Sequence, residues 1–261
     1  MNKKSLRAFI PAIFLLATLM TSSACSDDGK ALDEAKQEIT VVHTEPPETT
    51  DHHQHQHEDQ TQKHAQDQGT GVIAQDITGL YKELSSPQAT KTGDKIEVIE
   101  VFWYGCPHCY QFEPTINKWL KEKAGYIEFV RIPGVLGPQW VVHARAYYAA
   151  ENLGVLEKIH EPLFNAIHNE KRKIIDEKSL KSFFAEHGVT GNDFDKAYQS
   201  QEVEEKVRTA FSAGKNYELT GVPAIVINGK YTTSASMAGS FEKVVDVINT
   251  LSAKEYESLK Q

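Results

Sequence analysis

The sequence predicts an α/β fold in which a block of helices interrupts a small sheet. Three observations lead to this prediction. Residues 95–104 and 126–132 are β-branched and aromatic runs typical of buried strands, and a helical pattern joins them into a βαβ unit. The interval 137–215 carries helical patterns throughout. A third apolar run, residues 224–227, then precedes a hairpin turn and a last helix.

The first half of the fold depends on one strong strand and the helix after it. Residues 81–84 are a short, weak strand candidate. Residues 95–104 are the strongest strand candidate, and Gly105 ends them. The helix is expected to begin at Cys106, with Pro107 in its first turn, where a missing N–H costs no hydrogen bond.

The interval 137–215 is predicted to be an inserted α-helical domain. Its helices are expected at residues 140–153, 156–168, 179–187, 193–200 and 202–217. Gly154 fits the C-terminal cap of the first helix. Gly188 and Gly214 are expected to interrupt the later helices.

The chain then returns to the sheet. Residues 224–227 form a strand, Asn228-Gly229 is a strong hairpin signal, and residues 231–233 form the return strand. Residues 241–259 form the final helix. Without the inserted helices, this order of elements is that of a thioredoxin-like fold.

The N-terminus predicts export. A basic start and an uncharged apolar run at residues 8–20 indicate a signal peptide over residues 1–24, because a membrane span needs about 20 apolar residues. Ordinary signal peptidase would cut after Ala24. A lipobox would instead make Cys25 the lipidated N-terminus, although Ser22 stands where an apolar residue is usual. We favour this membrane lipid anchor over ordinary cleavage and over an uncleaved signal anchor, and all three place the folded part in the periplasm.

Residues 25–75 are a histidine-rich linker that precedes the folded domain at residues 76–261. Its central part is nearly free of apolar residues, so it is expected to be disordered. The most closely spaced histidines are His52, His53, His55 and His57. Such a cluster could hold Cu(II), Zn(II) or Ni(II). We favour a polar linker without metal, because no fold fixes a coordination geometry there.

Charge and cysteine content exclude several classes of protein. The formal net charge of −8 gives no electrostatic basis for binding nucleic acid. Three cysteines are too few for a disulfide-stapled miniprotein or for a four-cysteine zinc site.

The chemistry is predicted at Cys106-Pro107-His108-Cys109, which follows a strand and begins a helix, as redox motifs do. The helix N-terminus stabilises a thiolate on Cys106 through unpaired N–H groups and the macrodipole. Cys109 is expected to be more buried and to act as the resolving sulfur, while His108 adds a donor or a positive charge. Stabilising the reduced form makes a Cys106–Cys109 disulfide a stronger oxidant, and this chemistry needs no metal or organic cofactor.

Two other interpretations of the cysteine pair are weaker. A static disulfide around so small a loop adds little stability. A zinc site needs two further ligands, for which His143, His160 or the histidines of the linker are candidates. Val222-Pro223 favours the redox interpretation, because a thioredoxin-like fold has a cis-proline just before such a strand. The backbone of Val222 would there pair with an extended substrate peptide.

The run from Phe102 to Glu113, FWYGCPHCYQFE, resembles the active-site region of the DsbA family, the bacterial periplasmic disulfide oxidases. Residues 221–224, Gly-Val-Pro-Ala, resemble the cis-proline strand of that family. The Pro-His dipeptide and the valine before the proline are typical of its oxidase branch. The resemblance spans residues 81–259 and implies a thioredoxin-like fold with an inserted α-helical domain.

The resemblance also implies further site residues and a partner. Glu100 matches a partly buried acid beneath the active site, Glu113 matches a second acid, and Arg131 stands where the family typically has lysine. This cluster would tune the redox pair and move protons, although an arginine stays protonated and would pair with an acid instead. Reoxidation by a quinone-linked membrane oxidase of the DsbB type is implied. The extension with Cys25 fits a lipid-anchored branch.

The expected function is that of a periplasmic thiol:disulfide oxidoreductase, acting as a monomeric dithiol oxidase on reduced exported polypeptides through a mixed disulfide at Cys106. A disulfide reductase or isomerase is the first rival, and the reduction potential separates the two. A metal-binding or metal-delivery protein that works through the histidine tract is the second, and deleting residues 26–75 tests it. A pure binding module is the third, and Cys106→Ser tests it.

Overall fold

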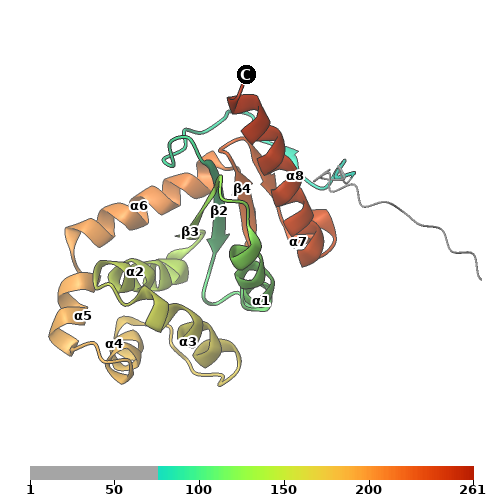
Figure 1. The fold of residues 1–261 in the computed structure, drawn as a ribbon. Helices are drawn as coiled ribbons and strands as arrows, with labels where there is room; N and C mark the ends of the chain where they lie inside the picture. Colours follow the sequence, from blue (N-terminus) through green and yellow to red (C-terminus); the bar gives the residue numbers. More distant parts are fainter. Residues whose placement is uncertain (1–75) are drawn as a thin grey trace, which may run out of the picture. The chain divides into compact units, whose positions relative to one another are not determined.

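The computed structural model describes residues 76–261 (Figure 1). The predictions for the signal peptide, for Cys25 and for the histidine-rich linker lie outside the described residues. Within residues 76–261, every helix is too short or too polar to cross a bilayer.

Within the described residues, the strands form one mixed sheet in the order β1-β5-β4-β2-β3. The strands are β1 (Lys82–Glu83), β2 (Ile96–Phe102), β3 (Ile127–Pro133), β4 (Ala224–Ile227) and β5 (Tyr231–Thr233). The central strand β2 pairs in parallel with β3 and antiparallel with β4. Every residue of β2 is buried, because helices cover both faces of the sheet.

The helices divide into two groups on the two sides of the sheet (Figure 1). They are α1 (Pro107–Glu122), α2 (Pro138–Asn152), α3 (Leu156–His168), α4 (Glu177–Glu186), α5 (Gly191–Tyr198), α6 (Gln201–Asn216), α7 (Ala235–Ala238) and α8 (Phe241–Leu259). Helices α1 and α8 lie side by side. Helices α2 to α6 all come between β3 and β4 and form the inserted block.

The cysteine motif lies where two buried clusters meet. One cluster fills the helical block and includes Tyr104, Cys106 and Cys109. The other lies between the sheet, α1 and α8 and includes Phe112 and Ile116 of α1. Helix α1 therefore anchors the motif in both halves of the domain.

The predicted elements are confirmed to within a few residues, with two exceptions. Gly214 does not interrupt a helix: it lies inside α6, where it is buried near Leu136. A single interior glycine costs only about 1 kcal/mol, which packing can offset. Helix α7 was not predicted, because four residues are too few to show a helical period. Ser234 caps its start by accepting a hydrogen bond from Met237 N.

Candidate active site

The start of α1 positions both cysteines. Cys106 is the N-cap residue of α1 and has an extended backbone. Its side chain makes no capping hydrogen bond to the first turn of the helix. Pro107 occupies the first turn, as predicted. Cys109 lies one turn further along and is completely buried, whereas Cys106 is 8% exposed. Cys106 is thus the sulfur that a substrate can reach.

Both cysteines are free thiols, so the structure represents the reduced form and the disulfide between them remains a prediction. A hydrogen bond from the Cys109 thiol and the backbone N–H groups of Cys109 and His108 outweigh burial and lower the pKa of Cys106 to about 6. Burial raises the pKa of Cys109 far above its ordinary range, and the hydrogen bond that the Cys109 thiol donates to Cys106 adds to this effect. The pair therefore combines a thiolate with a protonated thiol near neutral pH.

His108 lies on the exposed side of the motif. Its Nδ1 atom is 3.3 Å from Oε1 of Gln111. The electrostatic effect of His108 also lowers the pKa of Cys106, although it is smaller than the effects of the hydrogen bonds. The predicted helper histidine therefore lies beside the sulfur that it was expected to influence.

The cis-proline loop comes to the motif from the far end of the chain. The Val222–Pro223 bond is cis, as predicted. Cys106 Sγ lies 3.4 Å from the carbonyl oxygen of Val222, to which the thiol donates a hydrogen bond when it is protonated. The loop leads directly into β4 in the middle of the sheet, which holds it against the cysteine.

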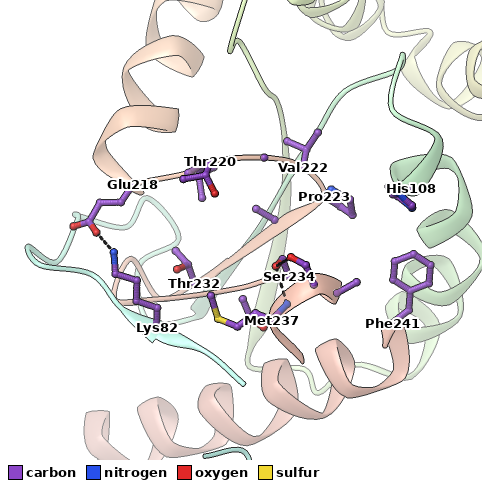
Figure 2. A pocket seen from close by; sticks show the side chains of 16 residues that line it. Lys82, His108, Glu218, Thr220, Val222, Pro223, Thr232, Ser234, Met237 and Phe241 are labelled. Carbon is purple, nitrogen blue, oxygen red and sulfur yellow. Dashed lines mark hydrogen bonds and ion pairs between the residues drawn. The ribbon is translucent and has the colours of Figure 1, made fainter. Parts of the chain in front are cut away.

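A groove runs along this loop and the end of the sheet (Figure 2). It encloses about 460 Å³ and is lined by residues that include His108, Val222, Pro223, Thr232, Met237 and Phe241. The side chain of Met237 is 39% exposed, and an ion pair of Lys82 with Glu218 borders the groove. The groove therefore offers apolar surface beside an accessible backbone.

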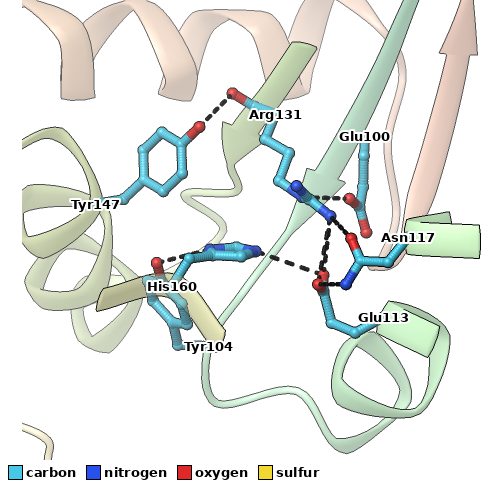
Figure 3. A network of polar contacts seen from close by, with 7 residues as sticks. All are labelled: Glu100, Tyr104, Glu113, Asn117, Arg131, Tyr147 and His160. Carbon is cyan, nitrogen blue, oxygen red and sulfur yellow. Dashed lines mark hydrogen bonds and ion pairs between the residues drawn. The ribbon is translucent and has the colours of Figure 1, made fainter. Parts of the chain in front are cut away.

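The three predicted tuning residues, Glu100, Glu113 and Arg131, meet in one polar cluster (Figure 3). Glu100 and Arg131 are direct partners in the pairing of β2 with β3, and Arg131 Nε donates to Glu100 Oε2 over 2.9 Å. Arg131 Nη2 lies 3.3 Å from Oε2 of Glu113 on α1. Glu100 is completely buried rather than partly buried as predicted, because β2 is the covered central strand.

The two acids differ in charge preference. Burial raises the pKa of Glu100 to about 7, despite the charge of Arg131. The pKa of Glu113 is lowered, because contacts with His160, Arg131 and Asn117 outweigh its burial. The pKa of Arg131 is raised by both acids against its burial, so it stays charged, as expected from its chemistry.

Sequence reasoning missed His160, Tyr104 and Asn117 as parts of this cluster. His160 Nδ1 lies 2.9 Å from the Tyr104 hydroxyl, and Asn117 Oδ1 accepts from Arg131 Nη2 over 3.1 Å. A histidine among the buried apolar positions of α3 was the available signal. His160 was considered only as a zinc ligand together with His143, whose Nε2 instead lies 2.7 Å from the carbonyl oxygen of Ile174. Residues 76–261 contain no cluster of three or more metal-ligating side chains.

Comparison with known proteins agrees with this site. Residues 97–248 match the family of the DSBA-like thioredoxin domain. The chain is 40% identical to the thiol:disulfide interchange protein DsbA of Pseudomonas syringae pv. tomato, over 69% of this chain and 84% of that protein. It is 38% identical to DsbA of Pseudomonas aeruginosa, over 74% of this chain and 92% of that protein.

Solved structures show the same relationship. The crystal structure of Pseudomonas aeruginosa DsbA superimposes with a TM-score of 0.67 at 38% identity, covering 70% of this chain and 96% of that one. The thioredoxin-like fold with an inserted helical domain is therefore confirmed, together with the predicted resemblance. With its Cys-Pro-His-Cys motif at the start of α1, the chain belongs to the DsbA family of thiol:disulfide oxidoreductases.

Proposed function

We propose that this protein is a periplasmic oxidase that transfers a Cys106–Cys109 disulfide to reduced, newly exported proteins. The observation that carries the proposal is the contrast between the two sulfurs. A Cys106 thiolate is stabilised in the reduced form, with a pKa of about 6, while Cys109 is held as a buried thiol. A stabilised reduced form makes the disulfide accept electrons readily, which is the property of an oxidant.

The reaction proceeds in two exchanges. A substrate thiolate attacks Cys106 Sγ, the bond between the cysteines breaks, and its electron pair goes to Cys109 Sγ, which takes up a proton. A second substrate thiolate then attacks the substrate sulfur of the mixed disulfide. Cys106 leaves as a thiolate, which its low pKa favours, and the substrate departs with a new disulfide.

The groove of Figure 2 is the proposed binding surface for the substrate polypeptide. An extended segment would pair with the backbone at Val222 and place apolar side chains near Met237 and Phe241. Backbone pairing is independent of side chains, so such a surface accepts many different proteins.

Reoxidation and membrane attachment complete the proposal. The relatives imply a DsbB-type membrane oxidase that takes electrons from the reduced cysteines. A lipid on Cys25 would tether the domain to a membrane through the long linker that precedes residue 76. Nothing in the chemistry of the cysteines requires a second subunit, so we expect a monomer.

The reduction potential of the cysteine pair, measured in a glutathione buffer, tests the direction of transfer. We expect a value near about −120 mV, which is the known figure for a DsbA oxidase and not a number obtained from this chain. A value near about −270 mV, that of thioredoxin, would instead mean that the protein works as a reductant.

A further inference from the structure

The two carboxylates that flank Arg131 have unequal surroundings (Figure 3). Glu100 accepts a hydrogen bond from Arg131 Nε, and its Oε1 atom is buried without a partner among the described residues. Glu113 has contacts at both oxygens: Oε2 accepts from Arg131 Nη2 at 3.3 Å and from Asn117 Nδ2 at 3.2 Å, and Oε1 accepts from Arg131 Nη2 at 3.5 Å. His160 Nε2 also lies 3.5 Å from Oε1, a distance longer than that of an ordinary hydrogen bond, and it has no closer partner among the described residues. Since a buried carboxylate needs several donors to stay ionised, the negative charge is expected on Glu113 and the proton on Glu100.

His160 turns Nε2 toward Glu113 and Nδ1 toward Tyr104 (Figure 3). It lies on the buried face of α3, and burial lowers its pKa, so the ring is neutral near pH 7. Its Nδ1 atom lies 2.9 Å from the hydroxyl of Tyr104. Tyr104 is fully buried, and burial raises its pKa, so this hydroxyl keeps its proton. We assign it as the donor to Nδ1, because the other tautomer would turn an unprotonated Nε2 toward the Glu113 carboxylate. The ring hydrogen is then on Nε2, which faces Glu113.

We propose that His160 is a positioning residue of the redox site: with Nε2 directed at Glu113 Oε1 over 3.5 Å, it favours Glu113 as the permanent carboxylate of the buried pair. The proton of the pair is then on Glu100, the acid to which the family resemblance already gives a role in proton movement. This inference deepens the proposed function and depends on it for the proton step. It does not depend on which way electrons flow between the protein and its substrates.

The other charged and titratable groups around the pair are compatible with this assignment. They come from four elements: Arg131 on β3, Tyr147 on α2, Cys109 on α1, and Glu157 and Glu161 on α3. Arg131 stays charged and contacts both acids, so it does not choose between them. Tyr147 donates to the carbonyl of Arg131 and not to either acid. Glu157 favours a charged His160, but burial has the larger effect.

The assignment matters when the disulfide opens. The electron pair of the broken S–S bond arrives on Cys109, which is buried and close enough to Glu100 for a charge there to raise its pKa. A protonated Glu100 gives its proton to the Cys109 thiolate and becomes a carboxylate. If the proton were on Glu113 instead, Glu100 would already be charged, and the Cys109 thiolate would face a second negative charge without a donor.

A cavity on the α3 side gives this pair access to solvent. It encloses about 340 Å³ and is lined by Glu113, Arg131 and His160, with Glu157 and Glu161 further along α3. Glu100 does not line it. Glu113 is thus the acid of the pair that borders the cavity, and Glu100 is shielded from it.

The first experiment measures where the proton is, without using oxidase activity. In the full-length protein, infrared spectroscopy with 13C-labelled glutamate follows the protonated carboxyl band against pH. We expect the band that titrates near the pKa of Glu100 to vanish in Glu100→Gln and to persist in Glu113→Gln. In the Glu100→Gln background, adding His160→Phe should raise the titration midpoint of Glu113 by about one pH unit, the effect of losing one hydrogen bond to a charge.

The matched control is His143→Phe, another buried histidine whose ring lies against Tyr104 but does not contact either acid. It should leave the Glu113 midpoint unchanged. The double variant Tyr104→Phe/His160→Phe removes the unpaired hydroxyl that His160→Phe leaves behind and guards against misfolding. His160→Gln keeps an N–H donor and should restore the midpoint. An unchanged Glu113 midpoint in folded His160→Phe would overturn the proposal.

The second experiment measures the rate at which a reduced dithiol peptide forms the mixed disulfide with the oxidised protein. We expect His160→Phe to slow this step several-fold below the pKa of Glu100, and the loss to disappear well above it, where Glu100 is ionised in both proteins. The same fold loss at every pH would mean that His160 has only a structural role. A reductant-like potential would contradict the proposed function and leave the infrared result unaffected.

Discussion

The exposed and the buried sides of the active site prefer opposite charge states. On the exposed side, hydrogen bonds at the start of α1 lower the pKa of Cys106 to about 6 and favour a thiolate. On the buried side, desolvation raises the pKa values of Cys109 and Glu100 and favours their neutral forms. A single helix turn separates the two sulfurs. The depth of each sulfur, more than its position along the sequence, therefore makes Cys106 the thiolate that leaves the mixed disulfide and Cys109 the sulfur that takes up a proton.

The largest effect is expected from removing one sulfur at a time. Cys106→Ser should abolish disulfide transfer, because Cys109, the other cysteine of residues 76–261, is completely buried. Cys109→Ser should instead leave stable mixed disulfides between Cys106 and substrate proteins, since the resolving thiol is gone. Non-reducing electrophoresis after incubation with a reduced substrate protein separates these outcomes. Equal trapping by both variants would mean that the two sides of the site are equivalent.

A smaller effect, on stability, is expected from Glu100→Gln. The pKa of Glu100 is about 7 in the folded protein, above the ordinary value of 4.5. In the pH window between these two values, the folded protein therefore binds more protons than the unfolded chain. Stability therefore falls as the pH rises from the ordinary to the raised value. Glu100→Gln should remove this loss and raise the free energy of unfolding by about 3 kcal/mol at pH values above the window.

Urea unfolding of the oxidised protein at several pH values measures this effect without the contribution of the Cys106 thiolate. Glu128→Gln is the control, because Glu128 is a surface acid of the neighbouring strand that pairs with Lys95. It should leave the pH dependence above the ordinary glutamate pKa unchanged, because Lys95 lowers the pKa of Glu128 and its own contribution falls at more acid pH. A loss of stability in Glu100→Gln above the window would mean that Glu100 is ionised there and that its ion pair with Arg131 dominates.

The smallest effect concerns the groove on the exposed side. Met237→Asp places a charge on its apolar lining and should raise KM for an apolar peptide substrate about tenfold, or about 1.4 kcal/mol. The pKa of Cys106, followed by thiolate absorbance, should not change, because the groups that set it belong to the cysteine motif and are left intact. Leu259→Asp, at an exposed apolar residue near the end of α8, should leave both quantities unchanged. An equal rise in KM with Leu259→Asp would count against the groove.

The exposed side of the active site is the part that the sequence predicts well. The exposed side depends on local features: a strand, Gly105, and a helix whose N-cap is Cys106 and whose first turn contains Pro107. Local patterns also located β4, β5 and α8 at their observed bounds. Each of these features is set by residues close together along the chain, so a short stretch of sequence contains all the information needed.

The buried side shows where such reasoning stops. Glu100, Glu113 and Arg131 were placed in one cluster only through the family resemblance, and their pKa order was not predicted. His160 and Tyr104 are 56 positions apart in the sequence, and only the packing of α3 against the sheet side brings them together. Gly214 was expected to interrupt a helix, because the local sequence does not show that Leu136, far away in the chain, packs near it.

The order of the elements, the redox motif at the start of a helix and the proline loop before β4 can all be predicted from short stretches of sequence, because backbone preferences and side-chain periodicity act over a few residues. The burial of each titratable group, and the donors that reach it, depend instead on how the helices and the sheet pack together. Desolvation and hydrogen bonding then separate Cys106 from Cys109 and Glu113 from Glu100 in charge, and both depend on atoms that distant parts of the chain supply.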